Sequence, residues 1–254
     1  MTPSTVAFTA TVGLVAGAVN SVAGGGTLVT FPALLATGMS PVTANVTSSV
    51  GLLSGYAGGS VAYRSELAGQ GRRVRALAVG SILGGVAGAV VLLVAPARTF
   101  QAVVPFLILV SSTLLAAQPR LSAAVAKRRP ERGVASAVGQ PVRGGVALAA
   151  VYGSYFGAGL GVLLLGVLGV LLDDDLQRLN ALKGLLSLII NVVGVVVFVA
   201  SGRVAWGYAA ILAITAYVGG SLGVVVARRL PPRLLRAAVV TLGVVVAGVL
   251  LLRG

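Results

Sequence analysis

The sequence predicts an all-α protein that crosses a membrane several times, and three observations carry this prediction. Of the 254 residues, 57% are hydrophobic and 9% are charged, whereas about a quarter of the residues in an average soluble domain are charged. The apolar residues form runs close to the roughly 18 residues that a spanning helix needs. The charged residues lie between these runs, so we expect a multi-pass protein of the cell membrane. The clearest runs are residues 74–95, 100–117, 204–227 and 234–252.

The composition also excludes several functions. A net charge of +14 would, in a soluble chain, suggest a nucleic-acid partner, but these cations lie in the loops between apolar runs. The chain contains no cysteine and no histidine, and no carboxylate falls in a predicted span. We therefore expect no enzyme, no metal, no cofactor and no nucleic-acid partner. The first ten residues carry no basic region, so a cleaved secretory signal is not expected.

The two halves of the chain resemble each other when the sequence is shifted by 135 positions. Chance could align glycines in a chain with 36 of them. It would not also align asparagine, proline and arginine at the same shift. We therefore predict a first membrane repeat at residues 1–118, a basic cytoplasmic linker at 119–142 and a second repeat at 143–254. The matched pairs include Gly24 with Gly159, Gly26 with Gly161, Asn45 with Asn180, Pro96 with Pro231 and Arg98 with Arg233.

The arginines and lysines predict the orientation, because positively charged loops remain in the cytoplasm. Three loops are rich in them, at residues 64–75, 120–143 and 228–236. If all three are cytoplasmic, residues 41–63 run inward and their counterpart, residues 179–200, runs outward. The two repeats are therefore predicted to be inverted, with both ends of the chain outside.

A glycine triplet interrupts the first apolar region, where residues 17–32 read GAVNSVAGGGTLVTFP. The second limb of this region, residues 27–38, is too short to cross a bilayer. We predict a hairpin that enters from outside, breaks at Gly24 to Gly26 and returns. Its counterpart, residues 144–172, breaks around Gly157, Gly159 and Gly161 and enters from the cytoplasm. Each inverted repeat thus has a broken helical hairpin followed by three spanning helices.

The triplet has no helical period, unlike the other glycines of the first half. Gly80, Gly84 and Gly88 recur every four residues, as do Gly51, Gly55 and Gly59. This is the small-residue pattern of close helix contacts in membranes, so packing is the role expected for both sets. Non-helical backbone at membrane depth, in contrast, is tolerated only in protein or in a water-filled cavity.

A broken helix offers backbone N–H groups and a positive dipole end, which suit an anion. Paired broken helices in inverted repeats are also typical of a transporter's central site. The sequence therefore predicts a carrier of small anions that works by alternating access around the two breaks. An anion channel remains the alternative, distinguished by large single-channel currents, and a structural subunit without transport is a third possibility.

The helix after the second hairpin carries Lys183, and a charged side chain within a membrane span has a high free-energy cost. Two interpretations stay open. Lys183 can face the pathway and bind the substrate anion, or its stem can carry the charge to the headgroups or to the acidic residues 173–175. Residues 173–175 are themselves expected to cap the next helix. The complete set of candidate substrate-binding residues is Asn20, Ser21, Gly24, Gly25, Gly26, Thr27, Asn45, Ser48, Ser49, Tyr155, Gly157, Gly159, Gly161, Asn180, Lys183, Ser187 and Asn191.

The stretch GGGTLVTFPALLATGMSPVTANVTSSVGLLSGYAGGSVAYRSEL resembles the TauE/SafE family of membrane anion exporters. The resemblance is carried by the glycine triplet, Pro32, the Gly38-x-x-Pro41 loop and the Tyr63-Arg64 ending. It implies export of small sulfur-containing anions such as sulfite, sulfoacetate or related sulfonates, and other members of the family handle different organic anions. The second half departs from the family's pattern, because Ala158 and Leu160 interrupt its glycines and Val167 replaces the proline. With no titratable relay predicted in the membrane, we expect electrogenic export.

Overall fold

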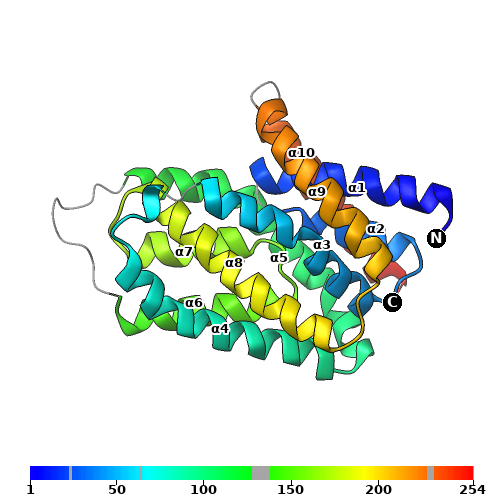
Figure 1. The fold of residues 1–254 in the computed structure, drawn as a ribbon, viewed down its shortest axis with the longest axis horizontal. Helices are drawn as coiled ribbons and strands as arrows, with labels where there is room; N and C mark the ends of the chain where they lie inside the picture. Colours follow the sequence, from blue (N-terminus) through cyan, green and yellow to red (C-terminus); the bar gives the residue numbers. More distant parts are fainter. Residues whose placement is uncertain (23–24, 63–64, 128–137, 228–231, 254) are drawn as a thin grey trace.

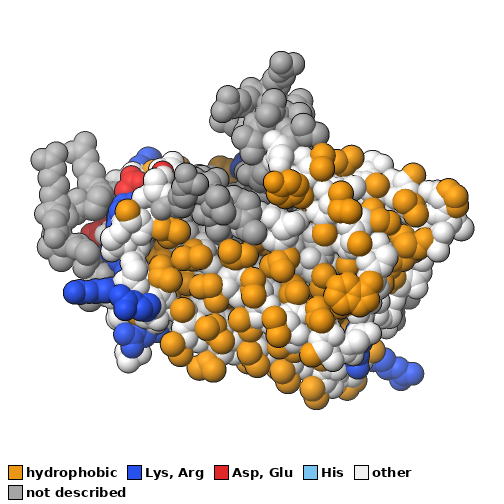
Figure 2. All heavy atoms as spheres, viewed as in Figure 1, with side chains coloured by type: hydrophobic (Ala, Val, Ile, Leu, Met, Phe, Trp, Pro, Cys, Tyr) orange, Lys and Arg blue, Asp and Glu red, His pale blue; other side chains and the backbone are white. Residues whose placement is uncertain are grey.

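The computed structural model describes residues 1–22, 25–62, 65–127, 138–227 and 232–253, which form α-helices and one short 3₁₀ helix. Four of the described helices, α1, α4, α5 and α8, are long and apolar enough to cross a membrane, which confirms the all-α membrane class. Exposed apolar side chains cover much of the face seen in Figure 2. In order, the elements are α1 (Pro3–Val22), α2 (Thr27–Ala36), α3 (Pro41–Ala62), η1 (Ser65–Leu67), α4 (Gly71–Val94), α5 (Ala97–Lys127), α6 (Gln140–Tyr155), α7 (Leu160–Leu171), α8 (Leu176–Ala200), α9 (Trp206–Ala227) and α10 (Pro232–Arg253).

Two broken hairpins are present at the predicted places. The short limb α2 has 10 residues and α7 has 12, both less than the 17–25 or so of a complete span. The hairpin α1–α2 opens toward the right of Figure 1 and α6–α7 toward the left. One boundary was predicted wrongly. The second break ends at Gly159, and Gly161 lies inside α7, because the apolar run that forms this helix starts at Leu160.

The helix starts refine the relation between the two halves. α8, α9 and α10 each begin 135 residues after α3, α4 and α5, but α7 begins only 133 residues after α2. The two extra residues of α7 absorb the difference. Within the hairpin, the helix starts are therefore offset by two residues from the gapless register, so that Gly26, just before α2, corresponds to Gly159, just before α7. The sequence did not reveal this offset, because Gly161, at the glycine-rich start of α7, also aligns with Gly26.

Glycines let helices from the two halves approach closely, as α4 does on α6 and α1 on α9. A Cβ atom on Gly88 would lie 2.1 Å from the Val151 carbonyl oxygen, and one on Gly84 would lie 2.4 Å from that of Ala147. Gly219 meets the Leu14 carbonyl at 2.1 Å in the same way. These distances leave no room for any side chain, so the packing role predicted for the α4 glycines is confirmed at Gly84 and Gly88.

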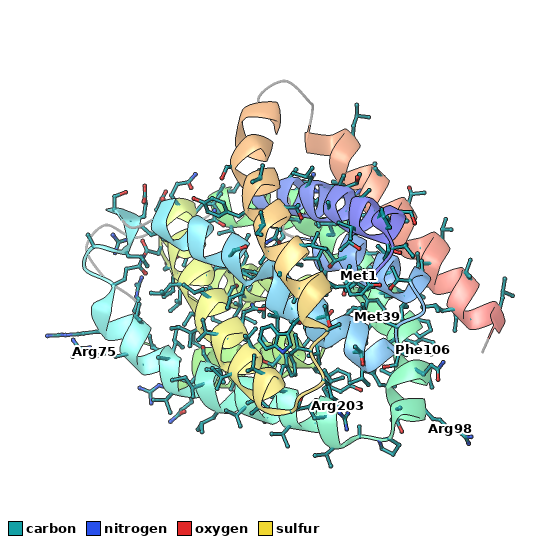
Figure 3. The ribbon with its side chains drawn as sticks, turned by 45° about the vertical axis from the view of Figure 1, so that its right-hand side comes forward. Met1, Met39, Arg75, Arg98, Phe106 and Arg203 are labelled. Atoms are coloured by element: carbon teal, nitrogen blue, oxygen red, sulfur yellow. The ribbon has the colours of Figure 1, made fainter. Side chains whose placement is uncertain are left out.

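Helix α5 is longer than its apolar run predicts. It continues through Pro119 to Lys127 and so includes part of the predicted linker at residues 119–142. The physical reason is packing on α7: Leu121 approaches Gly166, and Val125 approaches Gly169. The charged ends of the molecule lie where Figure 3 labels them, with Arg75 at one end and Arg98 and Arg203 at the other.

Candidate functional site

The second break is a buried turn between α6 and α7. Gly157 and Gly159 have φ angles of 81° and 78°, a left-handed conformation that only glycine adopts at low cost. Ala158 stands between them, and all three residues are buried. The local sequence GAG therefore explains why the helix stops here and restarts at Leu160.

The two breaks come together, as the sequence predicts. The Thr27 hydroxyl, at the start of α2, lies 4.0 Å from the position of a Cβ on Gly157. The Phe31 ring of α2 meets the Phe156 ring of the second break edge-on, with centroids 5.4 Å apart. Phe100 of α5 extends this aromatic cluster by contacting Phe31 and Tyr155. The cluster thus fills the space between the first hairpin and the second break.

Backbone groups of the second break differ in how they are satisfied. Most of its carbonyl groups are engaged: the Tyr155 oxygen accepts from Asn45 Nδ2 at 2.9 Å, and the Ala158 oxygen accepts from the Tyr152 hydroxyl at 2.7 Å, with Ser111 Oγ 3.0 Å away. In contrast, the N–H groups of Ala158, Gly159 and Gly161 meet no acceptor within the described part of the chain. Buried N–H groups without partners are rare in proteins. They therefore indicate a place for a ligand that accepts hydrogen bonds.

Lys183 lies against Gly161, the last of these three residues. Its Cδ atom is 3.9 Å from the position of a Cβ on Gly161, and its ammonium donates to Asn180 Oδ1 at 2.9 Å. The side chain is half-buried. Among the described residues its ammonium pairs with no carboxylate, so the snorkelling contact with residues 173–175 is not formed. A half-buried cation with one neutral partner can still accommodate an anion.

Residues 173–175 have two structural functions. Asp175 caps α8 by accepting a hydrogen bond from the backbone of Gln177 at 2.8 Å, as predicted. Asp174 does more than the predicted capping, because it forms ion pairs with Arg73 of α4 and Arg178 of α8. Burial alone would raise the pKa of the Asp174 carboxyl, but hydrogen bonds from Arg73, the Asp175 backbone and Arg178 outweigh it and lower the pKa.

The corresponding polar residues of the first half are bonded to one another. Ser48, which aligns with Lys183, shares a hydrogen bond with Thr30 of α2, and both residues are fully buried. The Ser49 hydroxyl donates to the Asn45 carbonyl of its own helix. Asn45 itself uses its amide on Tyr155, leaving its Oδ1 buried without a partner among the described residues. The first half therefore contributes packing and support more than free donors.

The remaining candidates divide between the two breaks. Asn20 lies against Gly26 and Gly55, and Gly25 faces Leu115. Ser187 and Asn191 continue the face of α8 that carries Lys183, and the Asn191 amide donates to the Ser187 carbonyl. Gly24 and the side chain of Ser21 lie outside the described residues.

Sequence reasoning missed four residues that this site uses. Ser111 and Tyr152 hold the second break, Thr30 holds Ser48, and Arg73 is buried against Asp174 rather than exposed in a loop. A pair of serines between two prolines in α5 was the only local signal of Ser111. Tyr152, Thr30 and Arg73 have no local sequence signal of their roles, because their partners are distant in the sequence.

These features define a class: a multi-pass helical membrane protein whose two broken helices meet beside a half-buried cation, the architecture of a membrane transporter. Residues 9–250 match the profile of the family described as "Sulfite exporter TauE/SafE", and the chain belongs to this family of membrane transporters.

Curated relatives support the assignment. The chain is 25% identical over 241 residues to "Probable membrane transporter protein YfcA" of Escherichia coli (strain K12), covering 94% of this chain and 87% of the relative. It is 26% identical over 212 residues to a "Probable membrane transporter protein" of Haemophilus influenzae, covering 84% and 81%. "Probable membrane transporter protein ORF9" of Sinorhizobium sp is 24% identical over 218 residues, covering 86% and 81%. No solved structure matches the chain significantly.

Proposed function

We propose that this protein exports small anions, sulfite or organosulfonates, by alternating access around the second break. One observation supports this most directly: the N–H groups of buried Ala158 and Gly159 and of half-buried Gly161 have no partner in the described chain, and Lys183 lies against Gly161. Backbone donors at a helix start and an ammonium are the groups that bind an oxyanion. Sulfite is the substrate that the family's description names.

In this proposal, Lys183 supplies the positive charge, and the N–H groups of the second break fix the orientation of the bound anion. Asn180 holds the ammonium through its side-chain oxygen at 2.9 Å, and the stem of Lys183 passes Gly161 near the start of α7. The oxyanion then receives hydrogen bonds from Ala158, Gly159 and Gly161 in place of water. The inverted arrangement of the repeats belongs to the same proposal. It is supported by the opposite openings of the two hairpins in Figure 1 and by the 135-residue spacing of three helix pairs.

Export needs no coupled ion in this mechanism. An anion that leaves a cell with a negative interior gains about 2.3 kcal/mol per charge for each 100 mV, which supports a roughly fiftyfold outward gradient. The described spans offer no Asp, Glu or His as a proton relay. We therefore expect electrogenic uniport.

The experiment uses the chain's two lysines. Lys183→Met is expected to abolish sulfite uptake into proteoliposomes while the protein still inserts and purifies, and Lys183→Arg, which keeps the charge, is expected to retain part of it. Lys127→Met removes the same charge from the exposed end of α5 and is expected to transport normally. Normal uptake by Lys183→Met would contradict the proposed site.

The same proteoliposomes test the mode of transport. Uptake is expected to saturate with sulfite concentration, to follow an imposed potassium diffusion potential and to persist when the pH gradient is collapsed. Large single-channel currents would establish the channel alternative. A strict requirement for a proton or sodium gradient would exclude uniport.

A further inference from the structure

We infer that Ser111 and Tyr152 determine the selectivity of the second break for anions, by occupying the backbone carbonyl that would otherwise repel the substrate. This inference rests on the proposed function. Neither residue is a ligand in it. Both act through the backbone of Ala158, and so they are positioning residues.

A broken helix exposes carbonyl groups as well as N–H groups, so its preference for an anion or a cation depends on which set is left free. In the second break, four of the five carbonyl groups from Tyr155 to Gly159 accept hydrogen bonds. Gly157 accepts from the Leu160 N–H at 3.3 Å, and Gly159 accepts from the N–H groups of Val162 and Leu163 at 3.0 and 3.1 Å. Tyr155 accepts from Asn45.

Ala158 is the critical case, because its neighbours in the chain do not supply its donors. The Tyr152 hydroxyl donates to its carbonyl oxygen at 2.7 Å, and Ser111 Oγ lies 3.0 Å from the same oxygen. Ser111 has a single hydroxyl proton, and the Leu107 carbonyl at 2.7 Å and the Tyr152 oxygen at 2.6 Å compete with Ala158 for it. Tyr152 is therefore the principal donor, and Ser111 can take its place when the Tyr152 hydroxyl is removed.

The geometry explains why donors and acceptors separate at this turn. Gly157 and Gly159 have positive φ angles on either side of Ala158, and the Ala158 carbonyl is held by α5 and α6. The N–H groups of Ala158, Gly159 and Gly161 keep no partner in the described residues. Among the described residues, the break then has three N–H groups without an acceptor and one carbonyl without a donor, that of Phe156. This balance suits an oxyanion better than a metal cation.

Either hydroxyl alone can still donate to the Ala158 oxygen. This redundancy gives a specific expectation for sulfite uptake into proteoliposomes. Tyr152→Phe and Ser111→Ala are each expected to raise KM by about twofold at most. The double variant leaves a buried carbonyl unpaired beside the anion and is expected to raise KM by about tenfold or more, with the maximal rate changed much less.

The excess of the double variant over the product of the two single effects is the decisive measurement. Because the two hydroxyl groups touch, a purely structural coupling would also depart from the product, but it would lower the maximal rate and leave KM unchanged. The excess must therefore appear in KM. Ser111→Thr combined with Tyr152→Phe keeps one hydroxyl on α5 and is expected to restore KM. Matched controls are Ser112→Ala, the adjacent buried serine of α5, and Tyr217→Phe on the exposed face of α9; both are expected to leave KM unchanged.

The outcomes distinguish a failure of the selectivity inference from a failure of the proposed anion export. A double variant with the KM of the wild type overturns the selectivity inference alone. Absence of anion uptake by the wild type overturns the proposed function, and the inference with it. If the double variant does not purify, Ser111→Cys with Tyr152→Phe replaces it. The thiol is a weaker donor, so an intermediate KM supports the inference and an unchanged KM contradicts it.

Discussion

Helices α4 and α6 provide a sharp test of how the two halves are held together. Along α4, Gly80, Gly84 and Gly88 share one face, but their distances to α6 differ. A Cβ on Gly80 would make an ordinary contact of 3.5 Å with the Ala147 side chain. A Cβ on Gly84 or Gly88 would lie 2.4 or 2.1 Å from a backbone oxygen of α6. The perturbation is the same substitution, to alanine, at each position.

The expected magnitudes follow from these distances. Real Cβ contacts below 3.0 Å essentially do not occur, so Gly88→Ala must move the helices apart by about 0.9 Å. A carbonyl oxygen cannot rotate away as a side chain does, and overpacking of this kind typically costs about 1–3 kcal/mol. We expect a loss of about 3 kcal/mol at Gly88 and about 2 at Gly84. Gly80→Ala is expected to be neutral or to stabilise by up to about 1 kcal/mol, the difference in helix propensity.

The assay is reversible unfolding in mixed micelles of a mild detergent and SDS, followed by far-UV circular dichroism. The free energies of unfolding of the three variants are compared with that of the wild type. Equal stability of Gly80→Ala and Gly88→Ala would refute the reasoning, because the two differ in little except the closeness of the α6 backbone. A loss at Gly80 with none at Gly88 would place the interface on a different register.

Two further predictions concern the ends of the molecule. The chain has no cysteine, so cysteines introduced at Arg98 and Arg203 are expected to react with an impermeant thiol reagent outside the cell. A cysteine at Arg75 is expected to react only after permeabilisation, and its labelling from outside would reverse the predicted topology. Asp174→Asn is expected to lose about 2–3 kcal/mol of stability at pH 7, because it leaves the buried Arg73 with a neutral partner. The pKa of Asp174 is lowered from its ordinary value of 3.8, so the carboxylate stabilises the fold above that pH and ceases to do so as the pH falls below it. The melting temperatures of wild type and variant should therefore converge in acid, and a constant gap from pH 7 to pH 3 would contradict the ion pair.

Much of the fold could be predicted because its signals are local. Length and apolarity identify spanning helices, and a limb such as residues 27–38 is visibly too short to cross. The glycine spacing of α4 identifies a packing face without naming its partner. The end of α5 was missed because Pro119 and several charges resemble a loop. Only the contacts of Leu121 and Val125 with α7 make that segment helical.

The candidate site was predictable in part for the same reason. Lys183 and the glycine breaks stand out in any apolar sequence. The contacts of Ser111 with Ala158 and of Arg73 with Asp174 join residues far apart in the chain, and a hydroxyl or an arginine gives no sign of such a partner. The alignment of the second hairpin was missed for a different reason. Gly26 can be matched with Gly159 or with Gly161, and the sequence favoured Gly161, two residues too late.

The two extra residues of α7 have a consequence for voltage. At 1.5 Å per residue they lengthen the second limb by about 3 Å, which is about a tenth of a hydrocarbon core. The other limbs differ in the opposite sense, because α1 has 20 residues and α6 has 16. In the proposed inverted arrangement, limb lengths therefore do not make the two breaks equally deep from their own sides of the membrane. A difference between the voltage dependences of internal and external substrate binding would measure how the two breaks divide the electric field.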